Sequence, residues 1–410
     1  MRTNRLSRWG LLLLAIAMIP LGVARAQTQL TLQQAIERAG RQRQELTAGA
    51  DRITAAQDQQ RQAGFSPNLR FFVQSENLRS GFQFSRDADS YAFIGQTLEV
   101  SGRRGGRVGL ASAAVSRSRM EQELTRREIL FRVRQAYWAA LGAQHVRDLY
   151  LQDVAHFRQV IDYNEARFRE GKVAEVDVLR VQVEGERLQS AAEDARLEYD
   201  RAQMQLAREL GDAPATLYEL TEDFEQLEMP RGRDTAEFVT GRPEYGLAEE
   251  AVRSARSRVV LEQAVGRPDV DVIGGYKRTA GFNTALAGLQ INLPLWNRNQ
   301  GAIAAAQREV SAAERLLQAT QLQLEAEHAI ARRQYDIRRE QVLLRYRPIR
   351  DRAVEIAEIG RAAYREGDTD LLRLLDSERL RTETQLAYVR MLGSYHQSVI
   401  ELERAGGMEP

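Results

Sequence analysis

The side chains that most often carry chemistry are scarce in this sequence and poorly spaced for it. The 410 residues include four histidines and no cysteines, which excludes disulfides, thiolate metal sites and cysteine nucleophiles. His145 and His156 lie eleven positions apart in helical sequence, roughly 16 Å along a helix and too far to share one metal ion. With no nucleophile–base pair or metal cluster in view, the sequence predicts no enzyme, no metal site and no cofactor.

A glycine-rich segment, Ser101–Gly106 (SGRRGG), stands before a helical stretch, as a phosphate-binding loop would. It lacks the G-x-x-x-x-G-K-[ST] pattern, and G-x-G-x-x-G does not fit it either. We interpret it as the joint between a strand and a helix.

Three aspartates, Asp368, Asp370 and Asp376, cluster near a short glycine turn. Carboxylates placed in this way could bind cations in transit. Acids at the start of a helix also serve as N-caps and as partners of the helix dipole. The sequence leaves both interpretations open.

The first 26 residues predict export. They combine a basic start, an apolar core from Leu11 to Ile19 and the sequence Ala24-Arg25-Ala26, so we expect a signal peptide cleaved after Ala26. Removing its four arginines would change the formal net charge from +1 to about −3, which gives no basic bias toward nucleic acid. Charged residues make up 28% of the chain, too many for a multi-helix membrane transporter.

Helical sequence dominates the remainder. Residues 103–170 are rich in Ala, Leu, Arg, Glu and Gln, with apolar positions at helical spacing, and a second helical stretch covers 173–210. The glycine at 171 stands where a helix ends. Helices of this length are typical of long pairs packed side by side rather than of a globular domain.

Four other segments predict strands: 67–78, 90–101, 268–279 and 284–295. Apolar and polar residues alternate in them over about ten positions, which is typical of membrane β-strands. Four strands cannot close a barrel, and an open edge cannot face lipid. If they cross a membrane, several copies of the chain must pool their strands.

The chain is also duplicated. A shift of 196 residues lays 166–211 over 362–407 without a gap, so that Gly171 falls on Gly367 and Gly211 on Gly407. We expect a first repeat at 27–211, a linker at 212–243 and a second repeat at 244–407. The second repeat would contain a helix, two strands, a long helix at about 299–366 and a helix at 369–405.

This organisation resembles the TolC-like outer-membrane efflux family over about residues 30–405. The motifs are LTLQQAIERA at 30–39, QTLEVSGRR at 96–104, LPLWNRNQGAIAAA at 293–306, and the two turn motifs REGKVAEVDVLRVQ from Arg169 and REGDTDLLRLLDSE from Arg365. The strand-to-helix motifs are most similar to the CzcC branch, the outer-membrane parts of heavy-metal efflux pumps.

The resemblance implies a mainly α homotrimer with membrane β-structure. Four strands from each copy would form a twelve-stranded outer-membrane barrel, and the long helices would form a coiled-coil tunnel through the periplasm. An equatorial belt would contain 212–243, a first helix at 31–63 and the segment 244–265. The implied partners are outer-membrane lipid, a periplasmic adaptor and an inner-membrane, proton-driven pump of the RND type.

A duct of this kind is passive and needs only a hydrated path and a gate. The resemblance places Asp376 at an acidic ring that narrows the closed periplasmic tip and matches Asp177 to an acid of the first tip. Asp376 falls on Arg180 in the duplication. We therefore expect Asp376 and Arg180 to hold the tips closed through ionic contacts between helices or copies; the alternative is that both are solvated charges.

The turns themselves should carry positive φ at Gly171 and Gly367. We expect the adaptor to contact the residues around them: Arg169, Glu170, Lys172, Val173, Arg365, Glu366 and Asp368. In the predicted strands and just after them, we expect aromatic residues to mark the lipid interface: Phe71, Phe72, Tyr91, Phe93, Tyr276 and Trp296.

Two alternatives remain open within the sequence. The duct could export drugs or, as in type I secretion, proteins instead of heavy-metal cations such as cobalt, zinc, cadmium, copper or silver. From a different class, the chain could be a periplasmic coiled-coil adaptor, although an adaptor would carry a single hairpin between β-domain halves.

Overall fold

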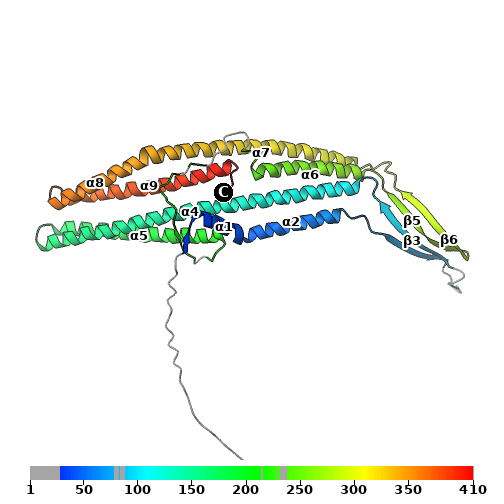
Figure 1. Cartoon of the computed structure of the whole chain (residues 1–410), viewed down its shortest axis with the longest axis horizontal. Coiled ribbons are helices and arrows are strands. Elements are labelled where there is room, and N and C mark those ends of the chain that lie inside the picture. The colour runs from blue at the N-terminus through cyan, green and yellow to red at the C-terminus, as the bar shows by residue number, and fades with distance from the viewer. Residues whose placement is uncertain are drawn as a thin grey trace, which may run out of the picture.

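The computed structural model describes residues 28–77, 83, 88–213, 216–227, 229–230 and 238–409. The predicted signal peptide with Ala26, the last residue of the first predicted strand and parts of the predicted linker 212–243 lie outside them. The described chain is elongated, with strands at one end and two helical hairpins at the other (Figure 1). Its helices are α1 (Leu32–Gln42), α2 (Gln44–Ala63), α4 (Arg103–Arg169), α5 (Glu175–Leu210), α6 (Pro243–Val265), α7 (Gln300–Glu340), η1 (Gln341–Tyr346), α8 (Arg347–Glu366) and α9 (Leu371–Ala405).

Helix α4 sets the length of the molecule. Its 67 residues extend for about 100 Å. It starts after Gly102, whose φ is +90°, and ends before Gly171. The apolar positions recognised in the sequence, including Ile129, Val133 and Ala140, are buried, so the amphipathic pattern gives the buried face correctly.

The sequence predicts one continuous long helix at about 299–366. The structure instead divides this segment into α7, the π-helical turn η1 and α8. Pro348 stands at the start of α8. Proline has no N–H to donate and its ring crowds the carbonyl four residues earlier, here that of Leu344 inside η1. The wider π-helical turn accommodates that defect.

The first predicted helix, 31–63, is also divided, at Arg43. The backbone of Arg43 is extended, with φ −70° and ψ 119°. Its guanidinium donates to the carbonyl oxygens of Arg208 and Glu209 at 2.8 and 3.2 Å, at the C-terminal end of α5. This contact with a distant element accounts for the break between α1 and α2, which the local sequence does not predict.

The short helices α2 and α6 lie along the sheet-proximal half of α4 (Figure 1). An added Cβ on Gly106 of α4 would come within 2.8 Å of the Cα of Leu261 in α6, so these two helices pack closely. The expectation that 31–63 and 244–265 belong to an equatorial belt is therefore wrong for α2 and α6, because they pack against the long helices on the sheet side of the middle.

The middle of the molecule holds the main core. Strand β1 (Thr28–Leu30) pairs in parallel with β4 (Tyr218–Leu220), and the Tyr137 hydroxyl donates to the carbonyl oxygen of Leu30 at 2.9 Å. Buried side chains from α1, α4, α5, α7 and α9 meet here. His396 stacks on Trp138, with ring centroids 3.7 Å apart, and hydrogen-bonds the carbonyl oxygen of Phe224 at 2.9 Å.

The remaining strands form one antiparallel sheet of order β2-β3-β5-β6. They are β2 (Arg70–Glu76), β3 (Asp89–Leu98), β5 (Val270–Thr279) and β6 (Phe282–Ile291). The predicted strands extended to 101 and 295, which is too far. The N–H of Val100 donates to the carbonyl of Leu98, and that of Leu295 to Leu293, both at 2.9 Å, so the backbone bends at equivalent points of the two halves.

Apart from the breaks at Arg43 and η1, each half of the described chain thus has the order helix, strand, strand, long helix, helix. No helix in the described ranges is both long and apolar enough to cross a membrane.

Candidate functional site at the hairpin tips

Both hairpins turn at glycines with the same backbone geometry. The φ angles of Gly171 and Gly367 are +71° and +87°, so the expected positive φ is present at both. The N–H of the next residue reaches back to close each helix: Lys172 to the Arg167 carbonyl at 2.8 Å and Asp368 to the Ala363 carbonyl at 2.9 Å. This is the Schellman arrangement.

The side chains of the tip turns are solvent-facing. Arg169, Glu170, Lys172, Arg365, Glu366 and Asp368 are exposed, and Val173 is partly buried. The Lys172 ammonium lies 2.7 Å from the Glu170 carboxylate, and this hydrogen bond lowers the pKa of Glu170. The turns therefore present a charged, accessible surface at the end of the molecule.

Asp370 has a structural role as the N-cap of α9. Its side chain accepts from the backbone N–H of Arg373 at 2.9 Å. The equivalent position before α5 is Ala174, which provides no side-chain cap. The described residues contain no group of three or more acidic or histidine side chains that could hold a metal ion.

The three residues expected at the gate lie near one another on α5 and α9. Arg180 and Asp177 form an ion pair of 3.5 Å one turn apart on α5, and both remain partly exposed. Asp376 is exposed on α9. Arg180 and Asp376 line one groove of about 380 Å³, but among the described residues no ion pair joins them. We call it the α5–α9 groove; it is lined by Val176, Leu179, Arg180, Val183, Glu184, Leu372, Leu375, Asp376 and Arg379.

Two contacts that sequence reasoning missed join the hairpins directly. The Arg379 guanidinium bonds both carboxylate oxygens of Glu184, at 3.1 and 2.6 Å. The hydroxyl of Tyr364 donates to the Asn164 side-chain oxygen at 2.5 Å in a buried position. Together they link α9 to α5 and α8 to α4.

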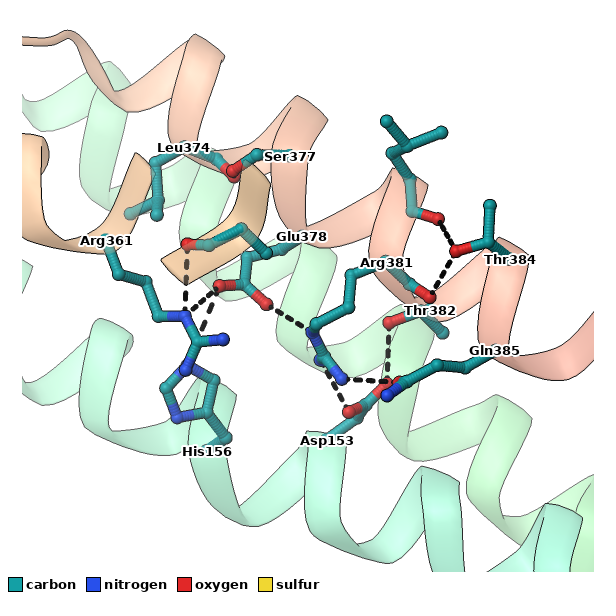
Figure 2. A network of polar contacts seen from close by, with 12 residues as sticks. Asp153, His156, Arg361, Leu374, Ser377, Glu378, Arg381, Thr382, Thr384 and Gln385 are labelled. Carbon is teal, nitrogen blue, oxygen red and sulfur yellow. Dashed lines mark hydrogen bonds and ion pairs between the residues drawn. The ribbon is translucent and has the colours of Figure 1, made fainter. Parts of the chain in front are cut away.

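A larger group of buried polar contacts lies behind the tips (Figure 2). Arg381 of α9 bonds Asp153 of α4 at 2.6 Å and Glu378 at 3.0 Å. Arg361 of α8 approaches Glu378 at 2.9 Å, and the Thr382 hydroxyl donates to Asp153 at 2.6 Å. We call this the interhelix network; it consists of Asp153, His156, Arg361, Glu378, Arg381 and Thr382.

The network holds two carboxylates away from water. The side chains of Asp153 and Glu378 are 4% and 6% exposed. Burial alone would raise the pKa of Glu378, but contacts with His156 and with the guanidinium groups of Arg381 and Arg361 more than offset this and lower it below its ordinary value. Glu378 is therefore ionised at neutral pH, and the network is a set of ion pairs that ties three helices together.

The histidines considered in the sequence occupy separate environments. His145 stacks on Phe224 with ring centroids 4.8 Å apart, and burial lowers its pKa. His156 stands 3.7 Å from Glu378. Neither belongs to a cluster that could bind a metal ion.

The register of the sheet corrects the expectation that all of its aromatic residues mark the lipid interface. Paired residues share a face, and neighbours along a strand point to opposite faces. The register places Phe71 and Tyr276 on one face and Phe72, Tyr91 and Phe93 on the other, so they cannot all contact lipid.

The two faces differ in composition. We define the apolar face by Phe71, Val73, Ile94, Leu98, Val270, Val272, Tyr276, Leu289 and Ile291. We define the polar face by Arg70, Gln74, Glu76, Asp89, Thr97, Asp271, Lys277, Thr284 and Gln290, to which the apolar residues Phe72, Tyr91, Phe93, Ile273, Phe282 and Leu286 also belong. The Arg70–Asp271 ion pair of 2.6 Å lies on the polar face. The apolar face is the one suited to lipid.

These features define a class of protein. Long antiparallel helices with accessible tips, joined at the other end to a sheet with one apolar face, are the parts of a duct that reaches from a membrane into an aqueous compartment (Figure 1).

The chain belongs to the outer membrane efflux protein family. The family model, "Outer membrane efflux protein", matches residues 35–212 and 240–408, one match for each half. The resemblance seen in the sequence is thereby confirmed, and the protein is placed in the outer membrane with its helices extending into the periplasm.

Individual relatives agree with this family. The cobalt-zinc-cadmium resistance protein CzcC of Cupriavidus metallidurans is 22% identical over 400 residues, covering 95% of this chain and 93% of CzcC. The alkaline protease secretion protein AprF of Pseudomonas aeruginosa is 26% identical over 257 residues, about half of each chain. The structure of CusC matches with a TM-score of 0.79 at 16% identity, covering 93% of both chains.

Proposed function

We propose that this protein is the outer-membrane exit duct of a tripartite efflux system that exports heavy-metal cations. The observation that supports this cargo is the match to CzcC, a cobalt-zinc-cadmium resistance protein, over nearly the full length of both chains. The duct is passive: it provides a hydrated path, while an inner-membrane pump of the RND type supplies energy and a periplasmic adaptor joins the two.

The open sheet supports assembly as a homotrimer. Within the described residues of one chain, strands β2 and β6 each leave one edge unpaired, and unpaired backbone cannot face lipid. Joining β6 of one copy to β2 of the next would close a twelve-stranded barrel from three copies. Helix α8 also exposes an apolar stripe, Ile349, Ile356 and Ile359, that a neighbouring copy would cover.

The gate of the duct is proposed at the periplasmic tips. Asp376 and Arg180, which line the α5–α9 groove, would contact neighbouring copies and narrow the closed tip together with Asp177. Substituting Asp376→Ala and Arg180→Ala should raise single-channel conductance in planar bilayers. Unchanged conductance in both variants would remove these residues from the gate.

The adaptor would dock on the tip turns. Arg169, Glu170, Gly171, Lys172 and Val173 of the first turn, with the second-turn residues Arg365, Glu366, Gly367 and Asp368, form an accessible, charged surface at the end that faces the inner membrane. Charge reversal at Lys172 and Arg365 should reduce co-purification of the adaptor, while the trimer remains intact.

The cargo is tested by growth of a strain that lacks this chain. Gradients of zinc, cobalt, cadmium, copper and silver are compared with dyes and antibiotics. Selective sensitivity to metals, restored by the wild-type gene, is the expected outcome. Normal tolerance of metals with sensitivity to organic compounds would retain the duct and reject the metal cargo.

A second candidate function is the export of organic compounds or of proteins. The match to AprF, a protease secretion protein, supports it over about half of the chain. Aromatic side chains on the polar face of the sheet support an organic cargo in particular. The same growth experiment separates export of metals from export of organic compounds.

A further inference from the structure

Three aromatic rings lie together on the polar face of the sheet, where the register leaves them away from the apolar face. Phe72 of β2 and Phe93 of β3 are parallel, with ring centroids 6.0 Å apart. Tyr91 lies 5.9 Å from Phe93 at an angle of 50°. The rings form a continuous surface near the middle of β3, which we call the aromatic cluster.

A cation completes the cluster. The ammonium of Lys277 in β5 stands 5.3 Å from the centroid of the Tyr91 ring. Three carboxylates of this face are engaged elsewhere: Asp271 pairs with Arg70, Glu76 accepts from Gln74, and Asp89 accepts from Asn77 and the Ala280 N–H. Among the described residues, the contact found for the Lys277 ammonium is the Tyr91 ring.

The cluster is open to a ligand. Phe72 stands at the edge strand and remains 50% exposed. An exposed phenyl ring on a face wetted by water gains free energy when another flat apolar surface covers it.

We propose that the aromatic cluster and Lys277 form a binding site for aromatic organic anions inside the duct. A planar ring would stack on Phe72 and Phe93, and its carboxylate or sulfonate would meet the ammonium of Lys277. The inference rests on the proposed function, because the exit duct is what turns the polar face of the sheet toward its lumen. It names the chemical class of the organic cargo in the second candidate function.

The binding test uses the full trimer in lipid nanodiscs, with empty nanodiscs as the blank and 2-naphthalenesulfonate as the probe. Wild type should bind the probe more tightly than methanesulfonate, which has no ring, and more tightly than 2-naphthylmethylammonium, which has the opposite charge. Phe72→Leu and Lys277→Gln should each weaken binding about three- to ten-fold, the effect of losing one stacking or charge contact. Lys277→Arg should retain binding.

Phe71→Leu is the matched control, because it makes the same substitution one residue away on the apolar face. Equal weakening by Phe71→Leu, equal binding of methanesulfonate, or no binding above empty nanodiscs would each overturn the site. Phe72 is substituted instead of the central Phe93 because Phe72 is more exposed, so its substitution disturbs the folding and assembly of the variant less.

Two further measurements separate this inference from the function on which it rests. The chain has no cysteine, so single Phe72→Cys and Phe71→Cys variants can be labelled cleanly with a charged, membrane-impermeant thiosulfonate; only Phe72→Cys should react. Conductance in planar bilayers tests the duct itself. A trimer that conducts without binding the probe overturns the site alone. A trimer that conducts neither as wild type nor with the gate substitutions Asp376→Ala and Arg180→Ala overturns the duct and the inference with it.

Discussion

The first hairpin, α4–α5, and the second, α8–α9, share a glycine turn but reach it in different ways. Helix α4 runs unbroken to its turn, whereas the second long helix passes through the π-helical segment η1. The second hairpin resumes with a capping Asp370, and the first resumes at Ala174 without a side-chain cap. The duplication has preserved the backbone turn and allowed the surrounding side chains to diverge.

The divergence makes the hairpins complementary. The arginines that join them, Arg379 and Arg381, lie on α9, and their partners across the interface, Glu184 and Asp153, lie on α5 and α4. In the duplication, Arg381 corresponds to Gly185, so the first hairpin does not carry the same charge. Near the tips, α9 thus supplies the cations and α4 and α5 supply the carboxylates, whereas the buried Arg134–Glu403 pair of α4 and α9, 2.5 Å long, has the opposite polarity.

The largest expected effect comes from removing the central cation of this pairing. Arg381→Met should lower the free energy of unfolding by about 3–5 kcal/mol, because it leaves the buried carboxylates of Asp153 and Glu378 without their shared partner. The measurement is the thermal midpoint of helical circular dichroism for the trimer. Arg379→Met is the control: its side chain is 47% exposed, and its partner Glu184 keeps a second cation, Arg187, at 3.6 Å, so its loss should cost about 1 kcal/mol. Equal shifts in both variants would contradict a special role for the buried pair.

The position of His396 provides the next test, because the first repeat has Asp200 there. Burial lowers the pKa of His396 to about 4, although its hydrogen bond with the Phe224 carbonyl acts in the opposite direction. In the unfolded chain the ordinary value is 6.5. Between pH 6.5 and 4 the unfolded state therefore binds a proton that the folded state does not bind. The free energy of unfolding falls by about 3 kcal/mol as the pH is lowered over this range.

The expected measurement is the unfolding midpoint at several pH values between 7.5 and 4.5. His396→Gln should remove this part of the pH dependence, whereas a matched His145→Gln variant should leave most of it. A wild-type midpoint that stays constant from pH 6.5 to 4.5 would show that His396 does not control acid stability.

The two turn glycines should respond alike, which tests what the hairpins still share. No atom lies within 4 Å of a Cβ added at Gly171 or Gly367, so the cost of alanine is the positive φ alone, about 1–2 kcal/mol at each site. Hydrogen exchange of the last turns of α4 and α8 measures it. Clearly unequal costs would mean that the turns have diverged in contacts as well as in caps.

The smallest expected effect concerns the caps. Asp370→Ala should cost about 1 kcal/mol by removing the acceptor for the Arg373 N–H. Ala174→Asp should stabilise the first hairpin by a similar amount, because it supplies the side-chain acceptor that α5 lacks. Amide exchange in the first turns of α9 and α5 measures both, and a stabilising effect of Asp370→Ala would exclude the capping role.

Features set by local sequence were predictable. Helical spacing, the glycine turns and the 196-residue repeat are properties of neighbouring or repeated residues, and they gave the order of elements and the positive φ at Gly171 and Gly367. The backbone at Arg43 was not predictable in this way, since the guanidinium bonds carbonyls of α5 more than 160 positions later in the chain.

The contacts between hairpins were missed for the same reason. Arg381 and Asp153 look like ordinary surface charges on long helices, and only the packing of α9 on α4 buries them. The faces of the sheet depend on register, and a shift of one residue exchanges Phe71 with Phe72. Their assignment required the pairing of β3 with β5, which joins the two halves of the chain.

That central pairing also has a consequence for biogenesis. Strand β3 pairs with β5 along residues 90–98 and 270–278, so its inner edge stays unsatisfied until the second half of the polypeptide has been synthesised and delivered. Contacts so distant in sequence form slowly, because a long loop must close first. During that interval the first β-hairpin exposes both an open edge and an apolar face, a combination that favours aggregation.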